Sequence, residues 1–149
     1  MKRIFIIIVL LSSCILSSAQ EGLYVEGLFE GEIIPRSEMK QTFIRGASLQ
    51  PYKLDTFKSI SFTVGEAMFK TVEMLVQKDV EAAPDKNTEY VGGHLTYAVA
   101  TLPQTIAGSN RYLCFQAKES NGMWVVTIVY LRGSAHVEDL NQMFNKRKR

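Results

Sequence analysis

The sequence predicts an α+β fold: a two-layer sandwich in which two helices cover one face of an antiparallel or mixed sheet of about five to six strands. Three observations lead to this prediction. An Asn-Gly pair separates two apolar runs, residues 57–64 alternate with a period of two, and a helical apolar stripe follows at once. Because each helix needs an apolar surface to cover, we expect both on the face that carries Phe115, Val126 and Ile128.

The Asn121-Gly122 pair is the strongest hairpin signal in the chain, because a type I′ turn needs two residues that tolerate positive φ. The register of the two arms follows from it. One face pairs Leu113 with Tyr130, Phe115 with Ile128, Ala117 with Val126 and Glu119 with Trp124, and the other pairs Tyr112 with Leu131, Cys114 with Val129, Gln116 with Thr127 and Lys118 with Val125. The second arm is apolar on both faces, which predicts an interior strand.

The N-terminal part of the domain predicts two short strands. Residues 23–29 alternate and form the first, and residues 39–45 form the second, after a segment punctuated by Gly31 and Pro35. Residues 46–55 contain Pro51 and show no period, so we expect a loop or an edge segment there.

The main helix is predicted directly after the strand at residues 57–64. Thr63 and Glu66 have the spacing of a capping box, and the helix ends before Pro84. Its inner stripe consists of Met68, Val72, Leu75, Val76 and Val80.

The C-terminal half predicts a loop at 83–93, a strand at 94–102, a loop at 104–110, the hairpin and a short helix. In the strand at 94–102 we expect Leu95, Tyr97 and Val99 toward the core, with Thr96 on the opposite face. Ser134 is the expected N-cap of the last helix, whose inner residues are Val137, Leu140 and Phe144.

The ends of the chain predict an exported protein with one domain. Residues 1–19 have the basic start, apolar run and small-residue end of a signal peptide, which leaves a single domain at 20–145 and a disordered basic tail at 146–149. The product is then periplasmic or secreted. The alternative is a lipoprotein, because residues 11–14 resemble a lipobox in which Cys14 is lipidated. Neither interpretation leaves a transmembrane helix in the mature chain.

The charge of the chain bears on its partners, and its cysteine content bears on disulfide bonds. Removing the six positive charges at the two ends from the net charge of +2 leaves −4 for the body, which argues against nucleic-acid binding. After cleavage at Ala19 only Cys114 remains, so no intramolecular disulfide forms and Cys114 is expected to be a small buried side chain.

Motifs for catalysis, cofactors or metals are not found in the sequence. His94 and His136 are isolated, without a second His or Cys at ligand spacing, so no metal or cofactor is predicted. We therefore favour a non-enzymatic module of the cell envelope that binds a protein or a glycan, through an exposed strand edge or a polar sheet face. The predicted binding residues on that face are Tyr112, Gln116, Lys118, Thr127 and Thr96.

Two other functions remain open. A small envelope hydrolase would need Glu26, Glu30, His94 and Arg111 to converge in one pocket. An inhibitor would present the loop at 104–110 to an enzyme.

The chain also resembles a family. The strand beginning Phe57-Lys58-Ser59-Ile60 leads into a helix start Gly65-Glu66-Ala67-Met68, and the run 124–133 precedes an Asp139-Leu140 helix. These features, within residues 57–144, resemble small secreted domains of unknown function common in Bacteroidetes. The resemblance implies export and an α+β fold, and its motifs are structural.

Overall fold

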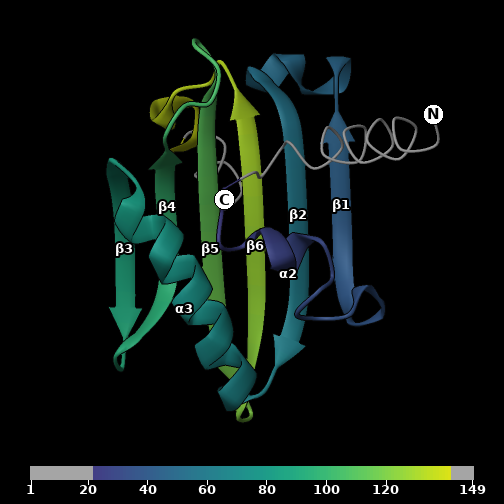
Figure 1. Ribbon diagram of the computed structural model, residues 1–149, viewed down its shortest axis with the longest axis vertical. Coiled ribbons are helices and arrows are strands. Elements are labelled where there is room, and N and C mark those ends of the chain that lie inside the picture. Colours follow the sequence, from purple (N-terminus) through teal and green to yellow (C-terminus); the bar gives the residue numbers. More distant parts are fainter. Residues whose placement is uncertain (1–21, 142–149) are drawn as a thin grey trace, which may run out of the picture.

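The computed structural model describes residues 22–141 and shows one antiparallel sheet of order β1-β2-β6-β5-β4-β3 (Figure 1). Its strands are β1 (Met39–Arg45), β2 (Leu54–Val64), β3 (Asp85–Val91), β4 (His94–Leu102), β5 (Asn110–Ser120) and β6 (Met123–Gly133). The helical elements are α2 (Glu26–Phe29), η2 (Arg36–Glu38), η3 (Ala47–Tyr52) and α3 (Glu66–Ala82), with a further short helix at 137–141. The predicted α+β class is confirmed.

The hairpin sets the centre of the sheet. Asn121 and Gly122 both have positive φ, 53° and 76°, as a type I′ turn requires. All eight predicted pairs between the two arms are present, from Tyr112 with Leu131 to Glu119 with Trp124. Because β6 also pairs with β2 along its length, it is an interior strand as predicted.

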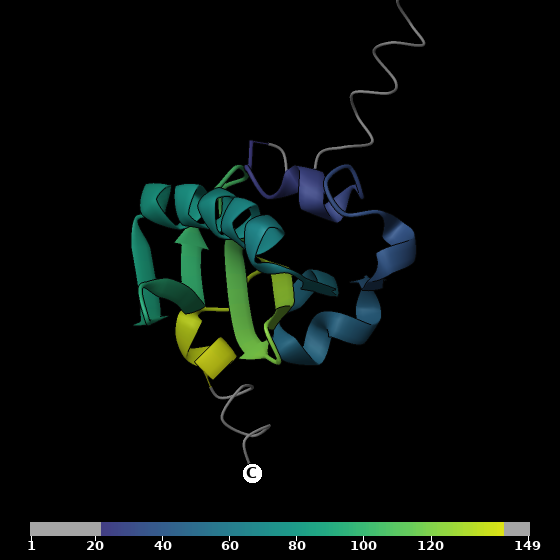
Figure 2. The ribbon, with the colours of Figure 1, turned by 90° about the horizontal axis from the view of Figure 1, so that it is seen from below.

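The larger core lies between the sheet and α3, on what we call the helix face. Helix α3 contributes Phe69, Val72, Val76 and Val80 to it. The N-terminal segment completes the cover with Val25, Leu28, Phe29 and Ile34. Figures 1 and 2 show α2 and α3 on this same side of the sheet.

A smaller core lies on the opposite side, which we call the second face. Leu49 of η3 and Leu140 of the C-terminal helix pack there with Tyr112 and Leu131, and Figure 2 shows both helical segments below the sheet. The prediction that the C-terminal helix shares the face of α3 is wrong. At this end of β5 and β6 both faces are apolar, so both need a cover.

Residues 23–29 do not form the predicted strand. Val25, Leu28 and Phe29 are buried at helical spacing, in a turn followed by α2. The carboxylate of Asp79 in α3 holds this segment, accepting hydrogen bonds from the Tyr24 and Val25 amides at 3.0 Å each. An amide that bonds to a side chain is not available to a strand ladder, which explains the difference.

Residues 83–93 are not a loop, because they contain strand β3. Its residues are exposed on both faces except for Thr88, which is half-buried, so the sequence carries no alternation there. A β-bulge at Thr96 also changes the faces of β4: Glu89 pairs with Tyr97, and the next residue, Tyr90, pairs with Leu95. Leu95 faces the larger core as predicted, whereas Tyr97 and Val99 face the other side.

The main helix has the predicted end but not the predicted cap. Gly65, not Thr63, is the N-cap, and glycine has no side chain with which to cap the helix. The Glu66 carboxylate accepts a hydrogen bond from Trp124 Nε1 instead of completing a capping box. Phe69 is buried in place of Met68, which is 37% exposed.

The predicted signal peptide, the lipobox at Cys14 and the basic tail lie outside the described residues, as does Phe144. Within residues 22–141 no helix is long and apolar enough to cross a membrane.

Candidate functional site

Three of the predicted binding residues lie together on the second face, away from η3 and the C-terminal helix. Gln116 and Lys118 are exposed, and Thr127, the partner of Gln116, is half-buried. Gln116 and Thr127 belong to a line of side chains across all strands, which we call the polar row: Lys40, Ser61, Thr127, Gln116, Tyr97 and Glu89, each paired with the next. Lys118 lies beside this row, two residues after Gln116 on β5. The row offers hydroxyl, amide and charged groups on a sheet surface.

Of the two other predicted binding residues, Tyr112 does not belong to this surface, and Thr96 lies outside the polar row, at the bulge in β4. Tyr112 is only 2% exposed, and its hydroxyl donates to the Ala135 carbonyl at 2.6 Å, so its prediction as a surface residue is wrong. Tyr112 is covered because its ring packs in the smaller core with Ala135 and with Leu140 of the C-terminal helix. Thr96 lies at the bulge and donates its hydroxyl to the Glu89 carbonyl at 3.3 Å.

The four residues of the hydrolase hypothesis are not brought together. His94 begins β4, whereas Arg111 pairs with Leu102 at the other end of that strand, about 26 Å away at the rise of a β-strand. Arg111 is buried and donates to the Tyr130 hydroxyl and the Pro103 carbonyl. The hypothesis required one shared pocket, and these residues do not form it.

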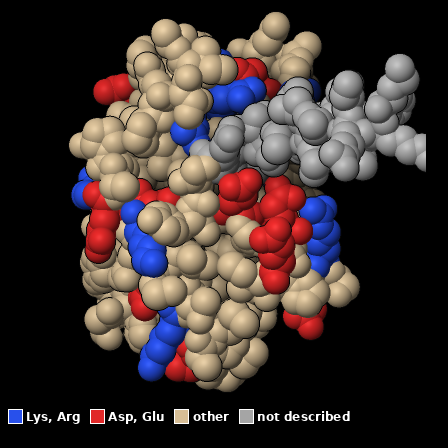
Figure 3. Space-filling model, in the orientation of Figure 1, with Lys and Arg blue, Asp and Glu red and all other residues tan. Residues whose placement is uncertain are grey.

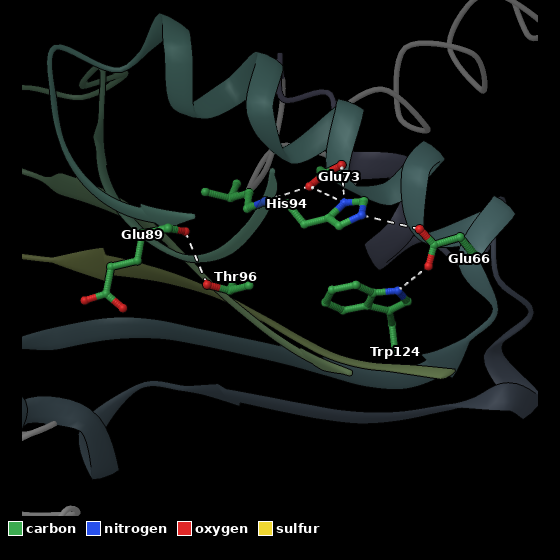
Figure 4. A network of polar contacts seen from close by, with 7 residues as sticks. Glu66, Glu73, Glu89, His94, Thr96 and Trp124 are labelled. Atoms are coloured by element: carbon green, nitrogen blue, oxygen red, sulfur yellow. Dashed lines mark hydrogen bonds and ion pairs between the residues drawn. The ribbon is translucent and has the colours of Figure 1, made fainter. Parts of the chain in front are cut away.

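His94 instead joins a cluster at the start of α3 (Figure 4). Its Nε2 lies 3.4 Å from Oε1 of Glu66, and its Nδ1 lies 3.3 Å from the Glu73 carboxylate. Glu66 also accepts from Trp124 Nε1 at 2.8 Å, and Glu73 accepts from the Leu95 amide at 2.6 Å.

The aromatic rings close this cluster. Phe69 stacks on Trp124 with the ring centroids 3.9 Å apart, and both rings meet the His94 imidazole edge-on. Each polar group therefore already has a partner inside the cluster, which ties the β3–β4 turn to α3. Among residues 22–141, no three His, Cys, Asp or Glu side chains are placed to hold a metal ion.

A hollow of about 440 Å³ opens on the helix face, between α2 and the first two strands. We call it the β1 hollow. It is lined by Phe29, Glu30, Arg36, Gln41, Thr42, Phe43, Arg45, Lys58, Ser59 and Ile60. In Figure 3 acidic side chains gather over α2, and basic side chains lie beside them on the β1 side.

The β1 hollow is basic. Of its charged residues, Arg36, Arg45 and Lys58 are cations and Glu30 is the one anion among the lining residues. Glu30 forms an ion pair with Arg36, whose Nη2 lies 3.6 Å from the Glu30 carboxylate. A surplus of positive charge in a concave surface favours an anionic group.

Two of these cations share one aromatic ring. The guanidinium carbon of Arg45 lies 5.3 Å from the centroid of the Phe43 ring, and Lys58 Nζ lies 5.0 Å from it. Desolvation lowers the pKa of Lys58, as does the charge of Arg45, while Glu30 and Glu26 raise it. Both cations therefore contact the same aromatic side chain, and the charge of Arg45 acts on Lys58.

The hollow adjoins a sheet edge. Strand β1 pairs with β2 through seven consecutive residues without a bulge, and no other described strand pairs with it. Its Phe43 and Ile44 are 55% and 37% exposed. The other edge, β3, meets β4 at the bulge and carries alternating charges, both of which protect an edge from pairing.

No local pattern in the sequence indicates the hollow. Strand β1 was predicted with its observed bounds, but the hollow needs Arg36, Phe43 and Lys58 from three separate elements. The period-two pattern does place Phe43 and Arg45 on one side of β1, which is the part of the site that the sequence contains.

These features define a small α+β domain with a partly open antiparallel sheet and a basic hollow beside its regular edge. A family of unknown function, DUF6108, matches residues 12–144, and the chain belongs to that family. No curated protein and no solved structure matches the chain.

Proposed function

We propose that the protein is an exported, non-enzymatic interaction module that binds an extended segment of a partner protein as an added strand beside β1. The observation that carries the proposal is the regular edge of β1, with exposed apolar side chains and a hollow along its helix face. Strand addition obtains affinity from main-chain hydrogen bonds and specificity from pockets for alternate side chains.

The contrast between the two edges supports this choice. An edge strand in a soluble protein is normally shortened, bulged or charged to prevent pairing. Strand β3 follows that rule, since its pairing is irregular and its residues Asp85, Lys86 and Glu89 are charged. Strand β1 keeps a regular register without a bulge, and this regularity is what distinguishes it, because both edges expose apolar side chains: Phe43 on β1 and Val91 on β3.

The test uses peptides selected on the purified chain from a randomised nonapeptide display library. Selected peptides are made again with N-methyl groups on alternate residues, in two sets. Successive residues of a strand direct their N–H groups to opposite sides, so only one set contacts β1. We expect one set to abolish binding and the other to be tolerated.

Hydrogen exchange locates the added strand. Binding should slow exchange at the amides of residues 39–45 and leave those of 85–91 unchanged, so β3 serves as the internal control. Peptides that tolerate both methylated sets, or that protect a region other than β1, would show that strand addition is not the mode of binding.

The proposal that the protein is exported rests on residues 1–19 and on the resemblance to secreted Bacteroidetes domains. Intact-mass measurement of the product in a bacterial host distinguishes the two processing routes. Cleavage after Ala19 gives a chain that starts at Gln20, whereas a lipoprotein starts at a diacylated Cys14. A mass equal to that of the uncleaved chain would contradict export by either route.

The polar row supports a glycan as a second candidate partner. It places Thr127, Gln116 and the half-buried Tyr97 side by side on one surface, and hydroxyl and amide groups around an aromatic ring suit a sugar. A glycan array separates the candidates, because Gln116→Ala should reduce sugar binding and leave peptide binding at β1 unchanged.

A further inference from the structure

Strand addition at β1 would place part of the partner over the basic hollow. Gln41, Phe43 and Arg45 are on the helix face of β1, since they pair with Ile60, Lys58 and Thr56. A neighbouring strand lies about 4.8 Å away, and the side chains directly opposite have Cβ atoms about 5 Å apart. Every second side chain of an added strand therefore stands beside these residues.

The charges of the hollow select among those side chains. Three cations and one anion line it, which leaves a surplus of two positive charges, and Glu26 reduces this surplus from outside the lining. Arg45 forms no ion pair with any residue in 22–141. The Arg45 guanidinium and the Lys58 ammonium both line the hollow, and both can donate charge-assisted hydrogen bonds to a carboxylate.

The Phe43 ring also disfavours an apolar occupant. Arg45 and Lys58 both lie over it, so a large apolar side chain that stacked on the ring would compete with these cation–π contacts. A basic side chain would add a like charge to a site that already lowers the pKa of Lys58 by desolvation and repulsion.

We infer that the partner strand places an aspartate or glutamate side chain in the β1 hollow, where Arg45 and Lys58 bind its carboxylate. The inference rests on the proposed strand addition and names the class of partner: an extended segment with an acidic residue at the position beside Phe43. When the partner's carboxylate enters the β1 hollow, Lys58 gives up part of its present contacts in order to bind it.

The test repeats the library selection and compares three variants with the natural chain. Arg45→Gln and Lys58→Met remove the two cations, and Lys40→Met is the matched control, because Lys40 lies on the same strand but in the polar row of the second face. Thermal unfolding of each variant verifies that it is folded before the selection.

We expect peptides selected on the natural chain to carry Asp or Glu at one position. Replacing that residue by Gln or Asn should weaken binding at least about fivefold, the size of a charge-assisted hydrogen bond. The preference should be lost on Arg45→Gln and on Lys58→Met, kept on Lys40→Met, and reduced by added salt.

The outcomes separate this inference from the function on which it rests. Peptides that protect β1 but bind equally well with Gln or with an apolar residue would overturn the acidic preference and leave strand addition standing. An acidic preference that Lys40→Met abolishes, and Arg45→Gln does not, would place the carboxylate on the second face and overturn the inference. A selection in which no peptide protects β1 would overturn both.

Discussion

Cys114 illustrates how position decides reactivity. It is 7% exposed in the smaller core, and burial raises the pKa of its thiol to about 12. Because the thiolate is the reactive form, the folded chain should leave this residue almost unreactive at neutral pH.

We therefore expect iodoacetamide at pH 7.5 to leave Cys114 unmodified in the native chain and to alkylate it in urea. If the uncleaved chain is used, peptide mass spectrometry distinguishes alkylation of Cys114 from alkylation of Cys14. Rapid alkylation under native conditions would contradict the position of Cys114 in the covered part of the second face.

Gly133 is fixed by a close contact between backbones. A Cβ at this position would stand 2.5 Å from the Lys53 carbonyl oxygen and 2.6 Å from Leu54 Cα, at the end of the β2–β6 pairing. We expect Gly133→Ala to lower the free energy of unfolding by about 1–3 kcal/mol, the usual cost of overpacking.

Urea unfolding measures this loss, with Gly65→Ala as the matched control. A Cβ at Gly65 would meet no atom within 4 Å, and its φ of −77° is open to any residue. Gly65 is the N-cap of α3, where Ala is less favourable than Gly, so we expect Gly65→Ala to lose less than about 1 kcal/mol. A loss at Gly133 no larger than the loss at Gly65 would show that the backbone contact is not the cause.

Strands were predictable from the sequence where buried and exposed residues alternate or where the turn residues are distinctive. Strand β4 was predicted with its observed bounds, and the hairpin with its full register, because alternation and turn chemistry act locally. Strand β1 is exposed at every residue except Met39, and its bounds were predicted from the turn residues before it rather than from a buried face. Strand β3 was missed because it is exposed on both faces and so shows no pattern. The N-terminal segment was misassigned because Asp79, more than fifty residues away, holds its amides.

Asp79 gives this segment a pH dependence. Desolvation raises the pKa of its carboxyl above the ordinary value of 3.8, against the hydrogen bonds from Tyr24 and Val25 and the charge of Arg111, which lower it. The folded chain thus binds the proton more tightly than the unfolded chain, and this contribution to stability is fully present below pH 3.8.

We compare the free energy of unfolding of the natural chain with that of Asp79→Asn. Relative to the variant, the natural chain should lose stability as the pH rises from about 3.8 to the raised pKa of Asp79 in the folded state. Above that pKa the difference should no longer change. Urea unfolding of both chains between about pH 3 and pH 7 measures the difference. A difference that grows in favour of the natural chain with rising pH would contradict the raised pKa.

At the scale of the molecule, the two faces of the sheet differ in cover at the centre of the hairpin, where the helix face is buried and the second face is partly exposed. Val126 is fully buried on the helix face, while its neighbour Val125 is 43% exposed on the second face. A charge at Val126 must enter the larger core without a partner, whereas a charge at Val125 stays in water.

We expect Val126→Asp to lower the free energy of unfolding by more than about 3 kcal/mol and Val125→Asp by less than about 1 kcal/mol. Circular dichroism during thermal unfolding compares the two variants. Similar melting temperatures would contradict the assignment of the faces.

The sequence predicted less of the site than of the fold, because the site depends on contacts between segments that are distant in the sequence. Gln116, Lys118 and Thr127 share a surface because the hairpin register puts them there, which is local information. The hollow joins Arg36, Phe43 and Lys58 through the order of strands, and Tyr112 is covered by a helix that the sequence assigned to the other face. Both depend on how distant segments pack.

The bulge between β3 and β4 also limits how many molecules can join. Among the described strands, the β1 edge of the sheet is regular and the β3 edge is not. The β1 edge of one molecule is therefore unsuited to pairing with the β3 edge of the next. Two copies that met through their regular margins would leave both irregular margins outermost. Such a pair is closed, and growth into a fibre stops at the first addition.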